Sequence, residues 1–228
     1  MAESPAATVA WQALAMMSSD GGDPVRRSSV RRRVTKETTI SVALDIDGGG
    51  RHDVRTGLPF FDHMLSQLAK HGGFDLDLEA TGDLEVDAHH TVEDTGILLG
   101  QCLAEALADR RGVRRFADVS IPLDEALVDV ALDLSGRPYI RYEVEIPEDA
   151  APLGQPGFDP QLAEEFWRAF ATAAGITLHV EMRCGKNIHH ILEASFKGVA
   201  RALRDAVRVE GDSVPSTKGS LGEGTASL

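Results

Sequence analysis

A segment near the middle of this 228-residue chain recurs near its end. The stretch HHTVEDTGILLGQCLAEAL, which begins at His89, aligns without gaps to HHILEASFKGVARALRDAV, which begins at His189. The constant offset matches two histidines and a glutamate at positions 89, 90 and 93 with the same residues at positions 189, 190 and 193. A repeat of this kind is one structural unit used twice, so the chain is expected to fold as two similar halves packed together.

Hydrophobic periodicity gives the two copies the same order of elements. Apolar residues at alternate positions predict strands, and apolar residues at helical spacing predict helices. In the first copy, the predicted strands cover residues 37–47, 51–57 and 74–82, and the helices cover 59–71 and 88–108. In the second copy, the strands cover 126–134, 139–146 and 176–182, and the helices cover 161–172 and 188–207. Both copies read strand, strand, helix, strand, helix, which predicts an α+β fold.

The folded part is predicted to begin near Thr35. Residues 1–30 are expected to form a disordered extension, because they offer little apolar surface to bury. The basic run from Arg26 to Lys36 is interpreted as a solvated linker. One domain is expected to span 31–221, with repeats at about 35–112 and 113–210 and a flexible tail at 222–228.

Composition argues against several classes of partner. The net charge of -13 repels phosphate backbones, so we expect no nucleic-acid partner. No apolar run approaches the length of about 18 residues that a membrane span needs, so we expect no membrane partner. The two cysteines, Cys102 and Cys184, do not make a disulfide framework, and the N-terminus is a poor secretory signal. A cytoplasmic protein is therefore expected.

The repeated histidines predict a metal centre. Adjacent helical residues project about 100° apart, so His89 and His90 are poorly placed to share one ion. Glu93 follows one turn later and can flank either of them. Two such helices facing each other would supply four histidines and two carboxylates. Extending the alignment backwards with a two-residue gap sets His63 opposite Glu165, and these residues could complete the two shells.

The ligand types indicate which ion is expected. Imidazole and carboxylate groups without thiolates argue against a structural zinc site. They suit a six-coordinate first-row ion with open positions, such as Mn²⁺.

These residues lie in motifs that resemble a known family. The segments LPFFDHML, EATGDLEVDAHHTVEDTGILLGQ, LDLSGRP, AGITLHV, GKNIHHILEASFKGVARALR and PSTKG are similar, in this order, to motifs of the imidazoleglycerol-phosphate dehydratases. The resemblance runs from about Arg33 to Leu221. It implies a duplicated α+β fold that resembles the ribosomal protein S5 domain 2-like fold, with each half a sheet backed by two helices.

The resemblance also implies an activity and an assembly. Members of this family are lyases of histidine biosynthesis that convert imidazole glycerol phosphate to imidazole acetol phosphate by loss of water. Their chains form a 24-subunit shell with metal sites at subunit interfaces. A homo-oligomer with interface active sites is therefore expected for this chain.

By position, the family's metal ligands imply two Mn²⁺ ions per active site. The matching residues are His63, His89, His90, Glu93, Glu165, His189, His190 and Glu193. Glu165 is a departure, because the family usually has a histidine there. Glutamate is a competent ligand for a hard cation, so either Glu165 binds the ion or water takes that position. We favour binding.

The resemblance implies further residues that contact the substrate. Glu37 matches a family residue that lies near the reacting carbons. The implied phosphate pocket consists of Arg115, Arg137, Lys197, Ser216 and Lys218. Guanidinium and ammonium groups suit a phosphate, and a serine adds a neutral donor.

The reaction needs acid–base groups because the carbon that loses its proton is not next to a carbonyl. Two cations could hold the imidazole ring as imidazolate and so provide the electron density that expels hydroxide. A carboxylate must then take the carbon proton, and an acid must assist the departing hydroxyl. Glu37 and Glu193 are the candidate catalytic residues, and their division of roles stays open at this point.

Two other functions fit part of the pattern. A binuclear metallohydrolase would also use paired histidine sites to activate water, although it would normally need more bridging aspartate. A metal-storage or metal-sensing protein would hold the ions as cargo, but it would have no use for the basic residues near PSTKG.

Overall fold

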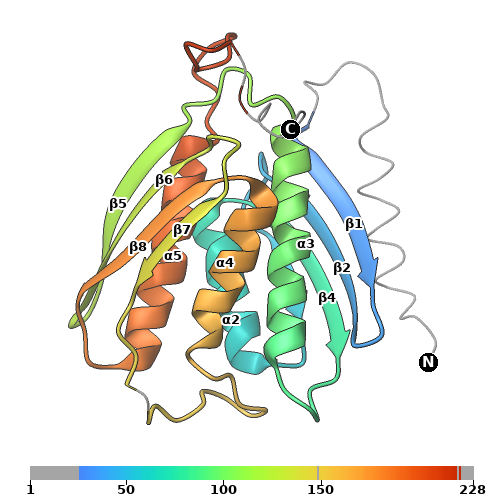
Figure 1. The fold of residues 1–228 in the computed structure, drawn as a ribbon, viewed down its shortest axis with the longest axis vertical. Helices are drawn as coiled ribbons and strands as arrows, with labels where there is room; N and C mark the ends of the chain where they lie inside the picture. The colour runs from blue at the N-terminus through green and yellow to red at the C-terminus, as the bar shows by residue number, and fades with distance from the viewer. Residues whose placement is uncertain (1–25, 148, 220, 222–228) are drawn as a thin grey trace, which may run out of the picture.

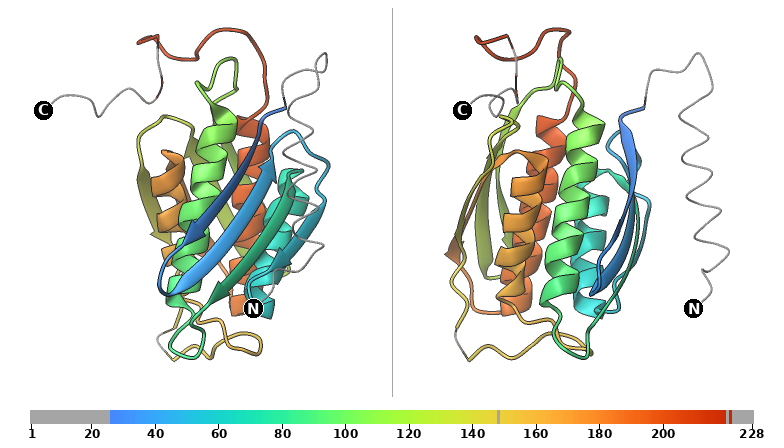
Figure 2. Two further views of the ribbon diagram at one scale, coloured as in Figure 1. Left: turned by 90° about the vertical axis from the view of Figure 1, so that its right-hand side faces the viewer. Right: turned by 45° about the vertical axis from the view of Figure 1, so that its right-hand side comes forward.

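The computed structural model describes residues 26–147, 149–219 and 221 (Figure 1). Two four-stranded sheets form the outer layers, and four long helices lie between them (Figure 2). Each sheet presents its apolar face to the helices, so one continuous hydrophobic core fills the space between the layers. None of the helices in the described part of the chain is long and apolar enough to cross a membrane.

The two halves have the same topology, which confirms the duplicated α+β fold. The first half contains β1 Ser28–Val34, β2 Thr38–Asp45, β3 His52–Arg55, α2 Pro59–Gly72, β4 Asp75–Gly82 and α3 His89–Leu107. The second half contains β5 Phe116–Leu123, β6 Ala126–Asp133, β7 Tyr139–Glu143, α4 Leu162–Ala174, β8 Thr177–Cys184 and α5 Ile188–Ala206. The sheet orders are β1-β2-β4-β3 and β5-β6-β8-β7. Each sheet ends in one parallel pair, β3 with β4 and β7 with β8.

Each half contains one strand more than the periodicity predicts. The additional strands, β1 and β5, are edge strands that pair antiparallel with β2 and β6. Several of their side chains are exposed, so their sequences lack the strong alternation of a half-buried strand. The predicted strand that became β3 lies at the opposite edge, beside β4 and not beside β2.

The interpretation of the basic run as a solvated linker is wrong. Strand β1 occupies most of it, so order begins at least seven residues before Thr35 and reaches into the range 1–30. Its arginines are paired with acidic groups, including Arg31 with Glu105 at 3.0 Å and Arg33 with Asp94 at 2.9 Å. Residues 1–25 of the predicted extension and the predicted tail at 222–228 lie outside the described residues.

Helices α3 and α4 pack closely because α3 presents glycine to α4. A Cβ atom at Gly96 would lie 2.7 Å from the carbonyl oxygen of Phe166. A Cβ atom at Gly100 would lie 2.5 Å from the carbonyl oxygen of Phe170. The two glycines are one turn apart on the same face of α3, so they bring the two backbones together along that face.

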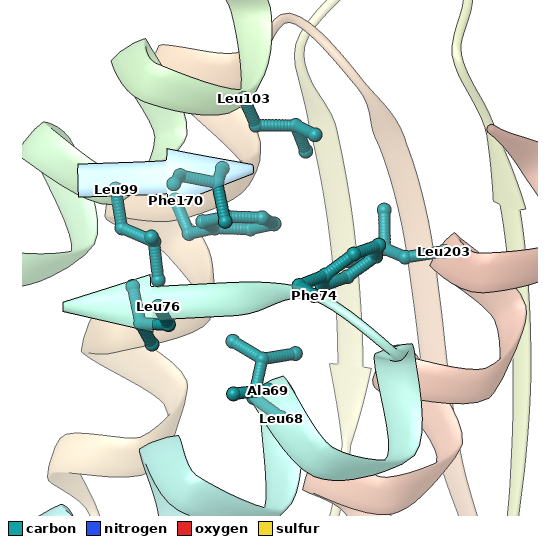
Figure 3. Close-up of a pocket in the computed structure, with 9 residues that line it drawn as sticks. Leu68, Ala69, Phe74, Leu76, Leu99, Leu103, Phe170 and Leu203 are labelled. Atoms are coloured by element: carbon teal, nitrogen blue, oxygen red, sulfur yellow. The ribbon is translucent and has the colours of Figure 1, made fainter. Parts of the chain in front are cut away.

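All four helices begin at the same end of the molecule, the lower end in Figure 1. The turns that follow β1, β4, β5 and β8 lie at that end, and the C-terminal segment that follows α5 lies at the opposite end. A small pocket between the helices and the first sheet is lined only by apolar side chains, among them Phe74, Phe170 and Leu203 (Figure 3). Such a lining does not suit a phosphorylated substrate, so the candidate site must lie elsewhere.

Candidate metal centre

Helices α2 and α5 bring three potential metal ligands together near their N-terminal ends. His63 lies in the second turn of α2, while His189 and Glu193 lie one turn apart on α5. The Oε2 atom of Glu193 is 2.9 Å from Nε2 of His189 and 3.3 Å from Nε2 of His63. Ligand atoms of the three residues all lie within 4.8 Å of one another. They form the only such group among the described residues.

Lys197 stabilises the ionised form of Glu193 in this group. Its Nζ atom lies one helical turn beyond Glu193, 2.6 Å from Oε1 of that carboxylate. Partial burial alone would raise the pKa of the Glu193 carboxyl. Hydrogen bonds from Lys197, His63 and His189 outweigh burial and lower the pKa to about 2. Glu193 is therefore a carboxylate at neutral pH, the state that a metal ion requires.

The repeat places a second, looser set of ligands where α3 meets α4. Nε2 of His89 lies 3.8 Å from Oε2 of Glu93, in the i, i+4 relation that His189 and Glu193 show. Glu165 lies near the start of α4, at the position that His63 takes in α2. These three residues are the counterparts of the compact group, but their ligand atoms do not all lie within 4.8 Å of one another.

The second histidine of each pair faces a different direction. The rings of His89 and His90 are nearly perpendicular, with centroids 6.2 Å apart, and those of His189 and His190 have the same separation. Nδ1 of His90 lies 3.1 Å from Oδ2 of Asp83. Neither His90 nor His190 joins the compact group of its own chain, in accordance with the 100° step between adjacent helical residues.

A carboxylate also holds His190. Its Nδ1 atom lies 2.8 Å from Oε2 of Glu125, in the turn between β5 and β6. The hydrogen bond to Glu125 raises the pKa of His190, and the hydrogen bond to Asp83 raises the pKa of His90. At low pH, a metal ion could bind His90 or His190 only after the ring has lost a proton.

The donor set of the compact group fits a divalent first-row ion. Two imidazole nitrogens and one carboxylate converge, and all three side chains are partly exposed. The residues that form it contribute no thiolate. Three ligands leave open positions on a six-coordinate ion, so substrate or further ligands could bind there.

Glu37 lies at the same end of the molecule as the histidines. It occupies the turn between β1 and β2, where its backbone N–H donates to Oγ1 of Thr35. Its carboxylate lies 3.9 Å from Nδ1 of His90. Glu37 is thus close to one of the predicted ligands, as a residue near the reacting carbons would have to be.

Most of the predicted phosphate-binding residues lie at the other end. Arg115 follows α3, and its guanidinium donates to Asp133 at 2.7 Å and to the carbonyl oxygen of Pro215 at 2.7 Å. Ser216 accepts a hydrogen bond at 3.2 Å from the backbone N–H of Lys218. Arg137 lies in the loop after β6, in which the backbone N–H of Leu134 donates to the carbonyl oxygen of Arg115 at 3.1 Å. Because α5 alone spans roughly 27 Å, one chain does not bring these residues to the compact metal group.

Lys197 is the exception among the predicted phosphate ligands. It lies near the middle of α5, one turn from Glu193, whereas the PSTKG segment follows the end of that helix. The periodicity and the repeat did not identify Asp83 or Glu125, which hold the second histidines. The repeat contained a signal for Glu125, because this residue precedes β6 as Glu37 precedes β2.

Comparisons with known proteins agree on one family. The family model described as imidazoleglycerol-phosphate dehydratase matches residues 56–203. The imidazoleglycerol-phosphate dehydratase of Gluconacetobacter diazotrophicus is 53% identical over 198 residues, which cover 86% of this chain and 98% of that protein.

Solved structures of the same family are also similar. The crystal structure of IGPD from Pyrococcus furiosus in complex with (S)-C348 has a TM-score of 0.72 and 39% identity, covering 84% of this chain and 100% of that one. The crystal structure of imidazoleglycerol-phosphate dehydratase from Staphylococcus aureus has a TM-score of 0.71 and 35% identity, covering 80% of this chain and 99% of that one.

Proposed function

The chain belongs to the imidazoleglycerol-phosphate dehydratase family, and we propose that it dehydrates imidazole glycerol phosphate to imidazole acetol phosphate with two Mn²⁺ ions in each active site. The observation that carries the metal requirement is the convergence of His63, His189 and Glu193 within 4.8 Å. We expect this dehydratase of histidine biosynthesis to act in the cytoplasm. Its two free cysteines fit the reducing conditions there.

Each ion takes ligands from both repeats in this proposal. His63, His189 and Glu193 hold the first ion. Their counterparts Glu165, His89 and Glu93 hold the second. Support for the second set comes from the matching His–Glu spacing on α3 and from the close packing of α3 on α4. Glu165 then acts as a ligand where the family usually has histidine, and it adds negative charge to that site.

His90 and His190 complete the two shells from other copies of the chain. Their rings turn away from the ligand groups of their own chain, and their Nδ1 atoms are held by carboxylates. A ring in this arrangement can offer Nε2 to a neighbouring molecule. The separation of the phosphate residues from the compact group within one chain also favours shared sites. We therefore expect a homo-oligomer with active sites at its interfaces, of 24 chains if the assembly follows the family.

The chemistry of the protein's own groups follows from their protonation. Bound Mn²⁺ would supply Lewis acidity that stabilises the imidazole ring as imidazolate. Glu193 is deprotonated at neutral pH, so it can accept the proton from the second carbon of the side chain, next to the carbon attached to the ring. Glu37 supplies a proton to the hydroxyl group that leaves, as water, from the carbon attached to the ring. The enol formed in this way becomes the ketone by proton transfer to carbon.

Binding of the substrate phosphate falls to the basic residues. Arg115 and Arg137 provide guanidinium groups, and Lys218 provides an ammonium group. Ser216 adds a neutral hydroxyl donor. Lys197 lies beside Glu193 in the metal group. It is therefore expected to contact the substrate where the metal group of one chain meets the phosphate-binding residues of another.

A product assay tests the proposal. Protein freed of metal with a chelator is incubated with imidazole glycerol phosphate, with and without added Mn²⁺. We expect formation of the ketone product only with Mn²⁺ and no release of inorganic phosphate. Phosphate release would support a metallohydrolase, and metal binding without turnover would support a storage protein.

A further inference from the structure

Glu125 ties the second histidine of α5 to the polypeptide backbone. Its Oε2 atom lies 2.8 Å from Nδ1 of His190. Its Oε1 atom accepts hydrogen bonds from the backbone N–H groups of Lys186 at 3.1 Å and Asn187 at 2.7 Å. These two residues lie directly before α5. The carboxylate therefore fixes the His190 ring relative to the start of the helix that carries it.

The contact also determines which ring nitrogen carries the proton. An ionised carboxylate can only accept hydrogen bonds, so Nδ1 of His190 must be the donor. In a neutral imidazole, Nε2 then has the free lone pair that a metal ion needs. Carboxylates that accept a hydrogen bond from a metal-binding histidine orient its ring and increase its basicity.

The first repeat achieves the same arrangement with a different residue. The pairing of Ile40 with Ala80 matches the pairing of Val128 with Met182, and the sequence VALD occurs in both β2 and β6 at an offset of 88 residues. This equivalence makes Glu37 the counterpart of Glu125.

The register between β6 and β8 shifts by one residue between Leu127 and Val128. Gly185 is therefore the counterpart of Gly82, and Lys186 is the counterpart of Asp83. In the first repeat, Asp83 lies 3.1 Å from Nδ1 of His90, whereas Glu37 lies 3.9 Å away, beyond hydrogen-bond distance. The second repeat has Lys186 at the position of Asp83, and Glu125 contacts the histidine instead.

We propose that Glu125 is a positioning residue that holds His190 with Nε2 free for a metal ion, and that Asp83 holds His90 in the same way. Because Asp83 performs this role in the first repeat, Glu37 is released for contact with the substrate. Glu37 and Glu125 thus occupy equivalent positions in the two repeats, but Glu37 contacts the substrate and Glu125 positions a histidine. This inference rests on the proposed function, since it assigns roles toward the same metal ions.

The decisive variant is Glu125→Gln. Its single carbonyl oxygen can still accept the backbone N–H groups before α5, so the fold is retained. Its amide NH₂ group then faces Nδ1 of His190 and favours the tautomer that protonates Nε2. The matched control is Asp118→Asn, which makes the same chemical change at an exposed position of β5. Asp83→Asn tests the corresponding contact in the first repeat.

The measurement is Mn²⁺ binding to the metal-free full-length protein, with free Mn²⁺ followed by electron paramagnetic resonance. We expect two tight sites per chain in the wild type and in the control. Glu125→Gln should weaken one of the two sites about 10–100-fold, the usual effect of losing such a partner. Asp83→Asn should weaken the other site, and the double variant should weaken both.

Thermal unfolding of the metal-free proteins separates positioning from a structural role. Glu125→Gln should unfold at the wild-type temperature. Two tight sites of wild-type affinity in Glu125→Gln would overturn the inference, and so would an equal loss at both sites together with a lower unfolding temperature. A wild-type protein that binds no Mn²⁺ would instead overturn the proposed function on which the inference rests.

Discussion

At the scale of single residues, the site depends on how each carboxylate is paired. Glu193 accepts hydrogen bonds from two histidines and from Lys197, which hold its pKa near 2. Glu125 has its pKa lowered to about 2 by backbone N–H groups and by His190. Both are therefore permanent anions at neutral pH, but only Glu193 lies in the compact ligand group. Similar residues thus acquire different roles from their immediate partners.

The Glu193→Gln variant tests whether Glu193 is both a metal ligand and the catalytic base. The change preserves size but removes the charge that binds metal and the basicity that accepts the proton. We expect turnover to fall by at least about 10²-fold, the usual scale for a positioned acid–base group. Steady-state kinetics with metal analysis checks this, and near-normal turnover would show that Glu193 is not the base.

Lys218→Ala should fail in a different way. Lys218 lies in the exposed segment after α5 and is proposed to bind the substrate phosphate. Losing this ion pair should raise the Michaelis constant by the equivalent of about 1.5–3 kcal/mol. Metal content should stay at the wild-type value, and turnover should fall less than in Glu193→Gln. Loss of metal from Lys218→Ala would place this residue in the metal site instead.

At the scale of helices and strands, the sequence predicts the ligand-bearing elements well. The helices that carry His63 and His189 have strong apolar periodicity because their apolar residues gather toward the core. Helix α3, which carries His89, is buried over more of its surface, and its apolar residues and its repeat in α5 identify it. Edge strands β1 and β5 were missed because backbone pairing, which leaves no hydrophobic pattern, holds them in place. The roles of Asp83 and Glu125 depend on turns that meet in space, so local patterns could not reveal them.

Close packing of α3 on α4 should be sensitive to one added methyl group. In Gly100→Ala, the new Cβ atom would lie 2.5 Å from a backbone oxygen of α4. Overpacking against rigid backbone should cost about 1–3 kcal/mol, more than the gain of about 1 kcal/mol in helix propensity. Thermal unfolding at equal protein concentration measures the effect. The control is Gly49→Ala, whose Cβ atom would meet nothing within 4 Å. Equal stability of the two variants would contradict close packing at Gly100.

At the scale of the whole molecule, the residues proposed to bind metal and most of those proposed to bind phosphate lie at opposite ends of the fold. The helix N-termini carry the predicted metal ligands, and most of the predicted phosphate residues follow the opposite ends of α3, α5 and β6. The repeat in the sequence predicts the two ligand sets but not this separation. It follows only from the directions in which the helices and strands run.

Metal removal should therefore change the assembly as well as the activity. If ligands from different chains share an ion, metal binding contributes directly to the free energy of association. Light scattering before and after treatment with a chelator should show a large particle converting to small oligomers, and Mn²⁺ should reverse the change. A particle of unchanged mass after verified loss of metal would show that the ions do not link the chains.

The most direct test of the shared site combines two inactive variants in one particle. Glu193→Gln removes a metal ligand, and Arg137→Ala removes a phosphate ligand. The two chains, carrying different affinity tags, are co-expressed, and mixed particles are isolated by purification on both tags in succession. If each site takes its metal group and its phosphate residues from different chains, some sites in the mixed particle contain only intact residues, and activity returns well above that of either variant alone. Mixed particles that are as inactive as the parent variants would contradict the shared site.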